Sequence, residues 1–386
     1  MRIIKFSVIL LVAFNSYSQD IVKKVLWNKI DNTAVQYANI KQDNFESISN
    51  ENGEININPT GGTITINTVS YELLQVEQSN YLIKDTIILQ PKIFNLNEVI
   101  INNSEKYVKM FNTVATEYAS EPHIEKFFIR AIIRKNGQLY KIADLSGLVE
   151  KKVLFGTTKK EMPKKNYIIN LENIRKIGIE FKEYDFEFFS LKIFLNIAVS
   201  GYLNPKKYKF DYFENENSKI YKIEAKPKDS IANKIKGHYF VNSDDNTFNE
   251  INTVNNNNQS EFQQIRNIKY RTIFFETRSK FKRNTKTHKY QLHQSILQYK
   301  TEVFNKKVKD IFDVTYVYTA TPENNLTEVD NNINIDKDMF EINGEYDNNY
   351  WQNNEVLPLT DEIQNFINLI NTKVEKPTFR TINNIK

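Results

Sequence analysis

The residues best suited to chemistry in this chain are histidines and carboxylates, and their spacing does not predict a metal site. The chain has four His and no Cys. A zinc hydrolase needs a His and a Glu spaced to reach one metal ion, with a third ligand further along the chain. Glu125 follows His123 by two positions rather than three, and His238, His288 and His293 have no Glu at ligand spacing. The sequence therefore predicts no metal ion and no cofactor.

One acidic segment matches a calcium-binding loop only in part. Oxygen-bearing side chains from Asp330 to Asp336 fall at loop positions 1, 3, 5 and 7, and Glu341 falls at position 12. Position 6 of such a loop makes a sharp turn that glycine favours, but here it is Ile335. A β-branched residue resists that turn. We therefore interpret the segment as a polar strand or loop.

The common catalytic motifs are absent from the sequence. It contains no Gly-X-Ser-X-Gly elbow, no glycine loop for phosphate and no dinucleotide fingerprint. These absences predict that the protein is not an enzyme. A hydrolase that assembles scattered Asp, Glu, Tyr and His side chains remains a third hypothesis, behind two non-catalytic ones given below.

The stretch from Tyr184 to Leu203 is the most apolar part of the chain after its N-terminal segment. Glu187 and Lys192 interrupt a run that is already short for a membrane span. The main interpretation is a buried core helix at about residues 186–200. The alternatives are a lid over an apolar pocket and a face that binds a membrane or a partner. Both alternatives give the same candidate contact residues: Phe186, Phe189, Phe194 and Ile197.

A basic cluster follows in the second half of the chain, around Phe281 and Tyr290. The cluster predicts a solvated hairpin tip, because runs of like charge usually face water. The functional alternative is contact with anionic lipid or polysaccharide at a cell envelope. The candidate residues for that contact are Lys280, Lys282, Arg283 and Lys286.

The N-terminus has the pattern of a signal peptide. Arg2 and Lys5 precede the apolar run from Phe6 to Phe14, and Ser16 and Ser18 provide small residues before a cleavage site. This pattern predicts export, with cleavage after Ser18, and a periplasmic or outer-membrane location. Without Cys, the mature chain can form no disulfide, so its stability must come from core packing.

Charge and length restrict the partners further. Loss of Arg2 and Lys5 from 52 basic residues, against 47 acidic ones, leaves a net charge of about +3. So small an excess argues against a nucleic-acid partner, because such proteins usually have a strongly basic face. With 386 residues, the chain is long enough for two or three domains. We expect no transmembrane span in the mature chain.

The first predicted domain, residues 19–101, consists of short alternating strands and tight turns. Asn52-Gly53 favours a hairpin turn before the strand Glu54 to Asn58. In the strand Thr63 to Val69, alternation places Ile64 and Ile66 on one buried face. Tyr81 to Leu89 is expected to form another strand. Together these patterns predict an antiparallel β-sandwich.

The order of motifs in this region resembles the carboxypeptidase-regulatory-like domain, a transthyretin-like β-sandwich found in envelope proteins of Gram-negative bacteria. The matching segments are Asn52-Gly53-Glu54-Ile55, Val69-Ser70-Tyr71, Ile87-Ile88-Leu89 and Leu96-Asn97-Glu98-Val99-Ile100-Ile101. The resemblance implies a folding or docking module with no catalytic role. Its partner would be an envelope protein or a glycan.

The second predicted domain, residues 102–386, is β-rich with a few helices. The helices are expected near residues 104–119, 186–200 and 361–371, and Asn136-Gly137 is a second hairpin signal. Successive strands without intervening helices predict an antiparallel sheet. The expected strands are Lys126 to Arg134, Gln138 to Val149, Tyr208 to Phe213, Ile220 to Ala225, His238 to Val241, Phe248 to Val254, Ile265 to Phe275, Tyr290 to Lys300 and Phe312 to Thr319. This order of strands is similar to the half-barrel of periplasmic lipoprotein carriers.

Two functions follow as hypotheses of different classes. The leading one is a non-catalytic envelope protein whose sandwich docks the larger domain to a protein or glycan. The alternative is a periplasmic carrier of a lipophilic ligand, held in a half-barrel pocket beneath residues 184–203.

Overall fold

The computed structural model describes residues 22–43, 45–59, 61–96, 104–156, 161–181, 187–214, 218–228, 234–256, 261–265, 268–305, 308–354, 356–371 and 379–385. The predicted signal peptide, residues 97–103 and Phe186 lie outside these ranges. The chain divides into a smaller unit, Met1–Pro91 with Glu355–Thr360, and a larger unit, Lys92–Asn354 with Asp361–Lys386. Both are built mainly from antiparallel strands, which confirms the predicted fold class.

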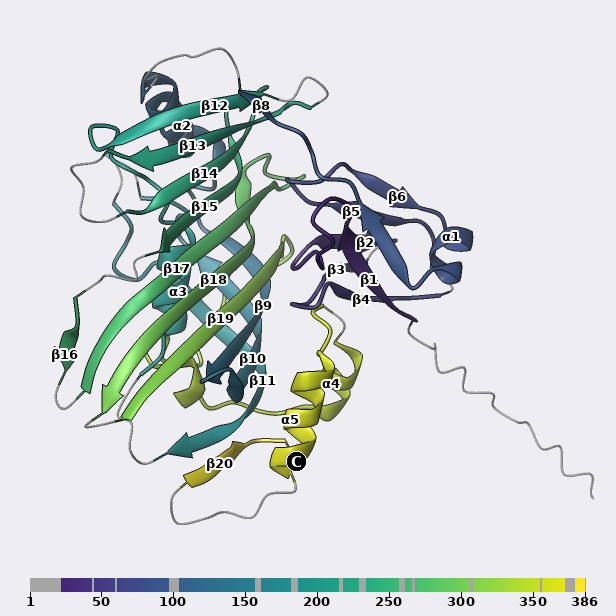
Figure 1. The fold of residues 1–386 in the computed structure, drawn as a ribbon, viewed down its shortest axis with the longest axis vertical. Helices are drawn as coiled ribbons and strands as arrows, with labels where there is room; N and C mark the ends of the chain where they lie inside the picture. Colours follow the sequence, from purple (N-terminus) through teal and green to yellow (C-terminus); the bar gives the residue numbers. More distant parts are fainter. Residues whose placement is uncertain are drawn as a thin grey trace, which may run out of the picture. The chain divides into compact units, whose positions relative to one another are not determined.

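The smaller unit consists of two sheets around one apolar core (Figure 1). Ile64 and Ile66 are both buried in that core, as their alternation predicts. Gly53 has a φ of +73°, the left-handed conformation for which glycine is suited. One sheet has the order β4 (Glu54–Ile57), β1 (Val22–Asn28) and β7 (Thr86–Leu89), and the other β3 (Phe45–Ile48), β2 (Asn39–Gln42), β5 (Ile64–Asn67) and β6 (Leu74–Val76).

The segment from Tyr81 to Leu89 differs from the prediction of one strand. The helix α1 (Gln78–Ile83) occupies its first part, and only β7 is extended. Tyr81 is buried, and its hydroxyl donates to the Gly61 carbonyl at 3.0 Å, which anchors the helix on the sandwich. β7 pairs with β1 in parallel, so the sandwich is not wholly antiparallel.

The larger unit contains one antiparallel sheet of 13 strands, in which the short strand β16 (Gln263–Ile265) pairs only with β17. The Asn136-Gly137 hairpin joins β9 to β10, and both residues have positive φ. The order along the sheet is β20 (Phe379–Asn383), β11 (Tyr167–Phe181), β10 (Gln138–Lys151), β9 (His123–Lys135), β19 (Val308–Pro322), β18 (Tyr290–Asn305), β17 (Ile268–Arg283), β15 (Phe248–Asn256), β14 (Lys236–Asn242), β13 (Ile220–Pro227), β12 (Tyr208–Glu214) and β8 (Asn95–Leu96).

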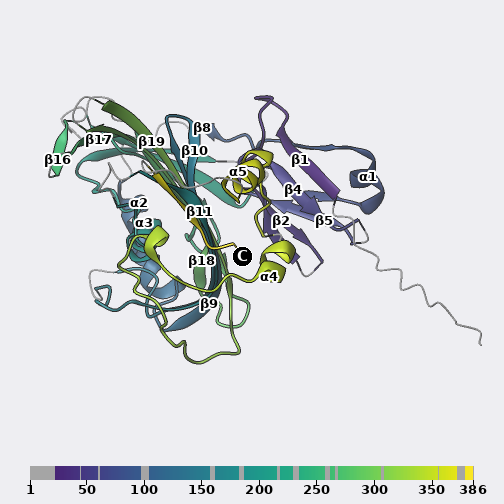
Figure 2. The same ribbon diagram turned by 90° about the horizontal axis from the view of Figure 1, so that it is seen from below.

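Helices cover both faces of this sheet (Figure 2). On the face that we call inner, Tyr107 of α2 (Ser104–Glu117) stacks on Phe210 of β12 with ring centroids 4.2 Å apart. Phe194 of α3 (Leu191–Ala198) contacts Tyr316 and Tyr318 of β19 on the same face. The outer face is covered by the short helix α4 (Asn348–Asn353) and by α5 (Asp361–Asn371), which packs against β11 and β20. The helices on the outer face thus cover the end of the sheet formed by β9, β10, β11 and β20.

Three features of the larger unit differ from the sequence prediction. β11 and β20 were not expected. The helix expected at about residues 186–200 is shorter, since it begins after the N-cap residue Ser190 and ends at Ala198. Leu96, assigned by motif to the sandwich, pairs instead with Phe213 of β12 in the large sheet. The remainder of that motif, residues 97–101, lies outside the described chain.

The helices of the described chain are short or interrupted by polar residues. In that part of the protein no helix combines the length and the apolar character needed to cross a bilayer. The apolar helix α3 has only 8 residues. At 1.5 Å per residue, a span of the hydrocarbon core needs roughly 20 residues.

Candidate functional site

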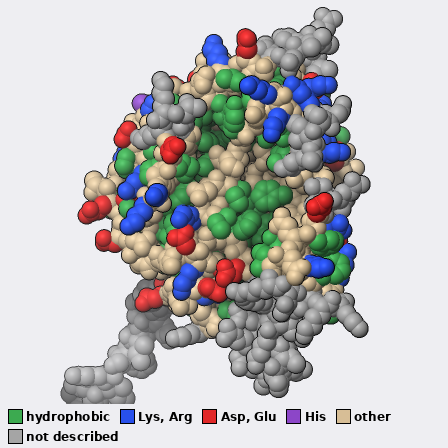
Figure 3. Space-filling view, turned by 90° about the vertical axis from the view of Figure 1, so that its left-hand side faces the viewer, with side chains coloured by type: hydrophobic (Ala, Val, Ile, Leu, Met, Phe, Trp, Pro, Cys, Tyr) green, Lys and Arg blue, Asp and Glu red, His purple; other side chains and the backbone are tan. Residues whose placement is uncertain are grey.

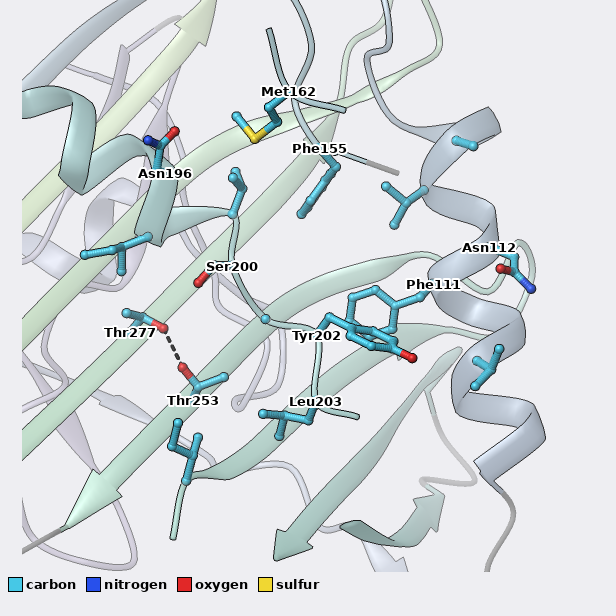
Figure 4. A pocket seen from close by; sticks show the side chains of 18 of the residues that line it. Phe111, Asn112, Phe155, Met162, Asn196, Ser200, Tyr202, Leu203, Thr253 and Thr277 are labelled. Atoms are coloured by element: carbon cyan, nitrogen blue, oxygen red, sulfur yellow. Dashed lines mark hydrogen bonds between the residues drawn. The ribbon is translucent and has the colours of Figure 1, made fainter. Parts of the chain in front are cut away.

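A cavity of about 1050 Å³ opens between α2, α3 and the inner face of the large sheet. Its wall is formed mainly by apolar side chains of α2, by the end of α3 with the following segment up to Leu203, and by β15 and β17 (Figure 4). This volume lies just above the roughly 300–1,000 Å³ range of small-molecule sites. The cavity is therefore the candidate functional site.

Figure 3 shows hydrophobic side chains gathered in the hollow of one face of the protein, with Lys and Arg side chains around it. The described lining residues include no Asp, Glu, Lys, Arg or His. They are Val108, Phe111, Asn112, Val114, Ala115, Thr116, Phe155, Gly156, Met162, Asn196, Ile197, Val199, Ser200, Gly201, Tyr202, Leu203, Ile235, Thr253, Val254, Asn255, Phe275 and Thr277. A lining of this kind is suited to apolar matter.

Helix α2 provides one wall because its apolar residues form two adjacent stripes. Tyr107, Met110 and Val114 are buried against the sheet. Phe111 lies beside that stripe and turns into the cavity toward Tyr202, with ring centroids 5.1 Å apart (Figure 4). Because the helix repeats every 3.6 residues, one stripe of α2 packs on the sheet and the neighbouring stripe faces the cavity.

A chain of buried hydrogen bonds fixes the segment that crosses the cavity. The Leu203 N–H donates to the Tyr107 hydroxyl at 2.8 Å, and that hydroxyl donates to the Tyr239 hydroxyl at 3.2 Å. The Tyr239 hydroxyl in turn donates to the Gly201 carbonyl at 2.7 Å. Burial raises the pKa of both tyrosines, so these hydroxyls stay protonated and act as donors.

The floor of the cavity contains one polar pair on two neighbouring strands. Thr253 of β15 and Thr277 of β17 lie directly opposite each other in the strand register. Their hydroxyl oxygens are 2.8 Å apart and form a hydrogen bond (Figure 4). Because each hydroxyl has a partner, this pair offers little unsatisfied polarity to a ligand.

The apolar residues predicted from the sequence divide between the cavity and the core. Ile197 lines the cavity. Phe194 is fully buried against Tyr316 and Tyr318, and Phe189 packs on Tyr299 and Tyr316. Phe186 lies outside the described residues. The structure therefore brings only Ile197 of these residues to the cavity.

The lining residues on α2, β15 and β17 were missed by the sequence analysis. In the helix predicted near residues 104–119, the spacing of Phe111 and Ala115 indicates an apolar face, but such a face usually packs in a core. Thr253 and Thr277 carry no local signal, because they become neighbours only through a strand pairing between distant segments. A sequence pattern can therefore indicate an apolar face but not the gap beside it.

The predicted basic cluster is not one surface. Lys282, Arg283 and Lys286 are exposed at the β17–β18 hairpin, where the Arg283 Nε donates to the His288 carbonyl at 2.9 Å. Lys280 differs, since only 8% of it is exposed and its ammonium lies in the field of Glu250. Burial lowers the pKa of Lys280 to about 8. The assignment of Lys280 to an exposed cluster is corrected accordingly, because alternation along β17 places it beside Glu250.

A second group of polar residues is buried on the inner face at the start of β9. The Lys151 ammonium contacts Glu125 Oε2, and the Tyr318 hydroxyl donates to the same oxygen at 3.3 Å. The Nε2 atom of His123 lies 3.6 Å from Glu125 Oε1. These side chains do not line the cavity. The group neutralises its own charge within the core.

Two carboxylates in or beside the calcium-like segment, Asp336 and Asp338, have structural partners. Asp336 pairs with Lys192 at 2.8 Å. Asp338 caps the 3-10 helix η1 (Met339–Glu341) and accepts from the Phe188 N–H at 2.7 Å. Within the described ranges, no three His, Cys, Asp or Glu side chains are grouped so that they could hold a metal ion.

The arrangement as a whole can enclose an apolar molecule, while the described lining offers hydroxyl and amide groups and no charged side chain. In comparisons with known proteins, no family model matches the chain and no match is found among curated proteins.

Proposed function

We propose that the larger unit binds a lipophilic ligand in the cavity between α2 and α3. The observation that supports this function is the combination of a volume of about 1050 Å³ with a lining free of charged side chains in the described chain. Transfer of apolar surface from water into such a site is favourable by about 25 cal/mol per Å². With the export signal predicted from the sequence, this gives a non-catalytic carrier in the periplasm or at the outer membrane.

The wall of the cavity supports a binding role over simple imperfect packing. Tyr202 lines the cavity and is 56% exposed, although the hydrogen bonds at Gly201 and Leu203 hold the backbone on either side of it. A large aromatic side chain held half in solvent costs free energy that contact with an apolar ligand would recover. The backbone hydrogen bonds at Gly201 and Leu203 support a site in which Tyr202 is held in place for such contact.

Binding of the neutral apolar dye N-phenyl-1-naphthylamine tests the proposal. We expect fluorescence enhancement with the wild type, and native mass spectrometry of freshly purified protein should show a co-purifying lipid. Ser200→Phe places a ring in the space that Ser200 faces in Figure 4 and should weaken dye binding by about tenfold, on the order of 1.4 kcal/mol.

Ser243→Phe is the matched control for that substitution. Ser243 is exposed in the turn between β14 and β15 and is not a lining residue. The control should bind dye as the wild type does. Equal binding by wild type and Ser200→Phe, or absence of both dye binding and co-purifying lipid, would contradict the proposed function.

We place docking to an envelope protein or glycan second, as a role for the smaller unit. The sequence motifs of a carboxypeptidase-regulatory-like domain motivate it, and one structural observation favours it. β7 is the last strand of its sheet, and its Ile88 is 57% exposed. An edge strand with an outward apolar side chain can pair with a partner strand. Ile88→Lys should then abolish co-purification of the partner from envelope extract, whereas Thr86→Lys on the same strand should not.

A further inference from the structure

Two buried polar atoms face each other at the start of β9. The Nε2 atom of His123 lies 3.6 Å from Glu125 Oε1, and the two side chains are only 8% and 1% exposed. Within the described chain, neither atom has a hydrogen-bond partner. Buried polar atoms are nearly always hydrogen-bonded, so this pair of atoms requires an explanation.

The other ring nitrogen fixes the position of the first proton on His123. Its Nδ1 atom lies 3.0 Å from the backbone carbonyl oxygen of the exposed Glu121. A carbonyl oxygen can only accept, so Nδ1 carries a proton and donates. In a neutral His123 the Nε2 atom therefore presents a lone pair to Glu125.

Glu125 remains a carboxylate in this group. Burial alone raises the pKa of Glu125, but the Lys151 ammonium outweighs that effect and the pKa is lowered. Lys151 contacts Oε2, and the Tyr318 hydroxyl donates to the same oxygen at 3.3 Å. Both of these donors lie at Oε2, so Oε1 faces His123 as an acceptor without a donor.

We propose that His123 holds a second proton at neutral pH and forms a buried ion pair with Glu125 through Nε2. An imidazolium has two N–H donors, and the site offers an acceptor to each of them, the Glu121 carbonyl and Glu125 Oε1. The carboxylate then lies between two cations, with Lys151 at one oxygen and His123 at the other. The distance of 3.6 Å is within the range of an ion pair.

The neighbouring side chains determine how firmly the second proton is held. Lys151 lies opposite His123 in the register of β9 and β10, so its positive charge opposes the added one. Glu125 lies beside both and attracts both. Tyr167 of β11 and Tyr318 of β19 stay neutral, because burial raises the pKa of each hydroxyl. The protonation of His123 therefore depends mainly on Glu125.

The ion pair closes the end of the β9–β10 ladder, near the cavity wall. His123 and Lys151 are the last residues that pair between the two strands. Just beyond them, the Leu154 N–H donates to the Ala119 carbonyl at 2.9 Å, and Phe155 lines the cavity. Loss of the second proton thus weakens the packing of a segment that leads to this wall. The inference itself does not depend on any ligand.

Nitrogen-15 NMR of the histidine rings in the full chain tests the proposal. At pH 7.5 we expect both ring nitrogens of His123 to carry protons, whereas an ordinary histidine is mostly neutral there because its pKa is about 6.5. Single Gln variants of the four histidines assign the signals, and the exposed His288 provides the reference. His123 should keep its second proton to a higher pH than His288. A single ring proton on His123 at pH 7.5 would overturn the proposal.

The dependence of stability on pH gives a second measurement. A proton held more tightly by the folded chain than by the unfolded chain adds stability that is fully present below about pH 6.5. That stability is lost as the pH rises through the value at which the folded chain releases the proton. The urea midpoint of the wild type should therefore fall between about pH 6.5 and pH 9, relative to that of His123→Gln. The Gln amide can donate to Glu125 and does not titrate.

His288→Gln is the matched control, because it removes an exposed histidine from the β17–β18 hairpin. Its midpoint should change with pH as that of the wild type does. The result is taken as a difference between proteins, since Lys280 titrates near pH 8 in all of them. If the midpoint of His123→Gln changes with pH as that of the wild type does, the second proton is not held at His123 and the proposal is wrong. If His123→Gln does not fold, the other three variants assign the His123 signal by elimination and the NMR result decides.

Discussion

The inner face of the large sheet has a filled part and an open part, and the same helix takes part in both. Phe194 of α3 is fully buried among aromatic rings of β19. Ile197, one turn later, is only partly buried and lines the cavity. Near the filled part, the charged residues Glu125 and Lys151 are enclosed and paired, whereas the described lining of the open part includes no charge. The packing around Phe194 thus contributes to stability, whereas the inner face near Ile197 leaves space for a ligand.

This difference explains how a cavity can persist in a stable fold. Interiors of proteins are usually close-packed, and an unfilled space costs dispersion contacts. The filled part, with its stacked rings and buried ion pair, offsets that cost. Changes in the filled part should therefore affect stability most, and changes in the open part should mainly affect ligand binding.

The largest expected effect is the loss of a buried charge partner in the filled part. Lys151→Met leaves Glu125 buried without its cation, and loss of one partner of a buried pair costs about 3–5 kcal/mol of unfolding free energy. Urea unfolding followed by tryptophan fluorescence would measure it. Lys126→Met on the neighbouring strand β9, where the side chain is exposed, should change stability by less than about 0.5 kcal/mol. Similar stability of both variants would contradict the importance of the pair.

Truncation of Phe194 and of Ile197 to Ala compares the packing of the two positions on α3. Phe194→Ala removes a ring surrounded by other rings and should cost about 3–5 kcal/mol. Ile197→Ala should cost only about 1 kcal/mol, because one side of its side chain already faces the cavity. The two unfolding free energies, measured under the same conditions, give the test. Equal losses would mean that the cavity wall is packed as tightly as the core.

Much of this architecture follows from local patterns in the sequence, and the exceptions have physical causes. β9, β10, β18 and β19 contain alternating or nearly continuous apolar residues bounded by turn signals, so their positions were predicted. β11 was not, because its alternation changes phase within the strand. Leu171 and Ile174 both face the inner side, since the strand register shifts between Ser146 and Gly147 of its partner and leaves Glu172 as an extra residue. A bulge of this kind hides the period of two.

The candidate site was harder to predict than the fold. An apolar helix was predicted from residues 184–203, but local sequence gives no difference between Phe194 and Ile197. Their roles depend on what each side chain faces. Phe194 faces β19, whereas Ile197 faces the cavity beside α2. The same limit applied to Lys280, whose burial depends on β15 across the sheet. Long-range pairing decides these environments.

Acidification should lower the unfolding free energy, through the buried ion pairs, before it changes ligand binding in the cavity. The Lys151 ammonium holds the pKa of Glu125 below its ordinary value of 4.5, and Arg130 and Arg175 do the same for Asp144 on the outer face. A lowered carboxyl pKa in the folded state gives stability that is present above the ordinary value and is lost as the pH falls below it. The effect should be smaller than that of Lys151→Met, because a protonated carboxyl group keeps its position beside the cation. Urea midpoints measured from pH 7 to pH 3 should fall below about pH 4.5.

A double variant provides the control for this pH dependence. Glu125→Gln with Lys151→Met removes both charges of the pair, so its stability should fall less steeply with acid than that of the wild type. Binding of the neutral dye should persist over the range in which the protein stays folded, since no described lining residue titrates there. Loss of dye binding well above the unfolding transition would contradict the separation of the two parts.

The smallest expected effect concerns the one polar pair of the cavity floor. Thr253→Val with Thr277→Val replaces two hydrogen-bonded hydroxyls by methyl groups of similar shape, which is nearly neutral for stability when both partners are removed together. Dye affinity should rise about two- to threefold, because the ligand no longer covers hydroxyl groups. Thr253→Val alone leaves the Thr277 hydroxyl without this partner and should cost about 1 kcal/mol of stability. Unchanged dye affinity in the double variant would place the bound dye away from β15 and β17, and would contradict the assignment of the cavity as the binding site.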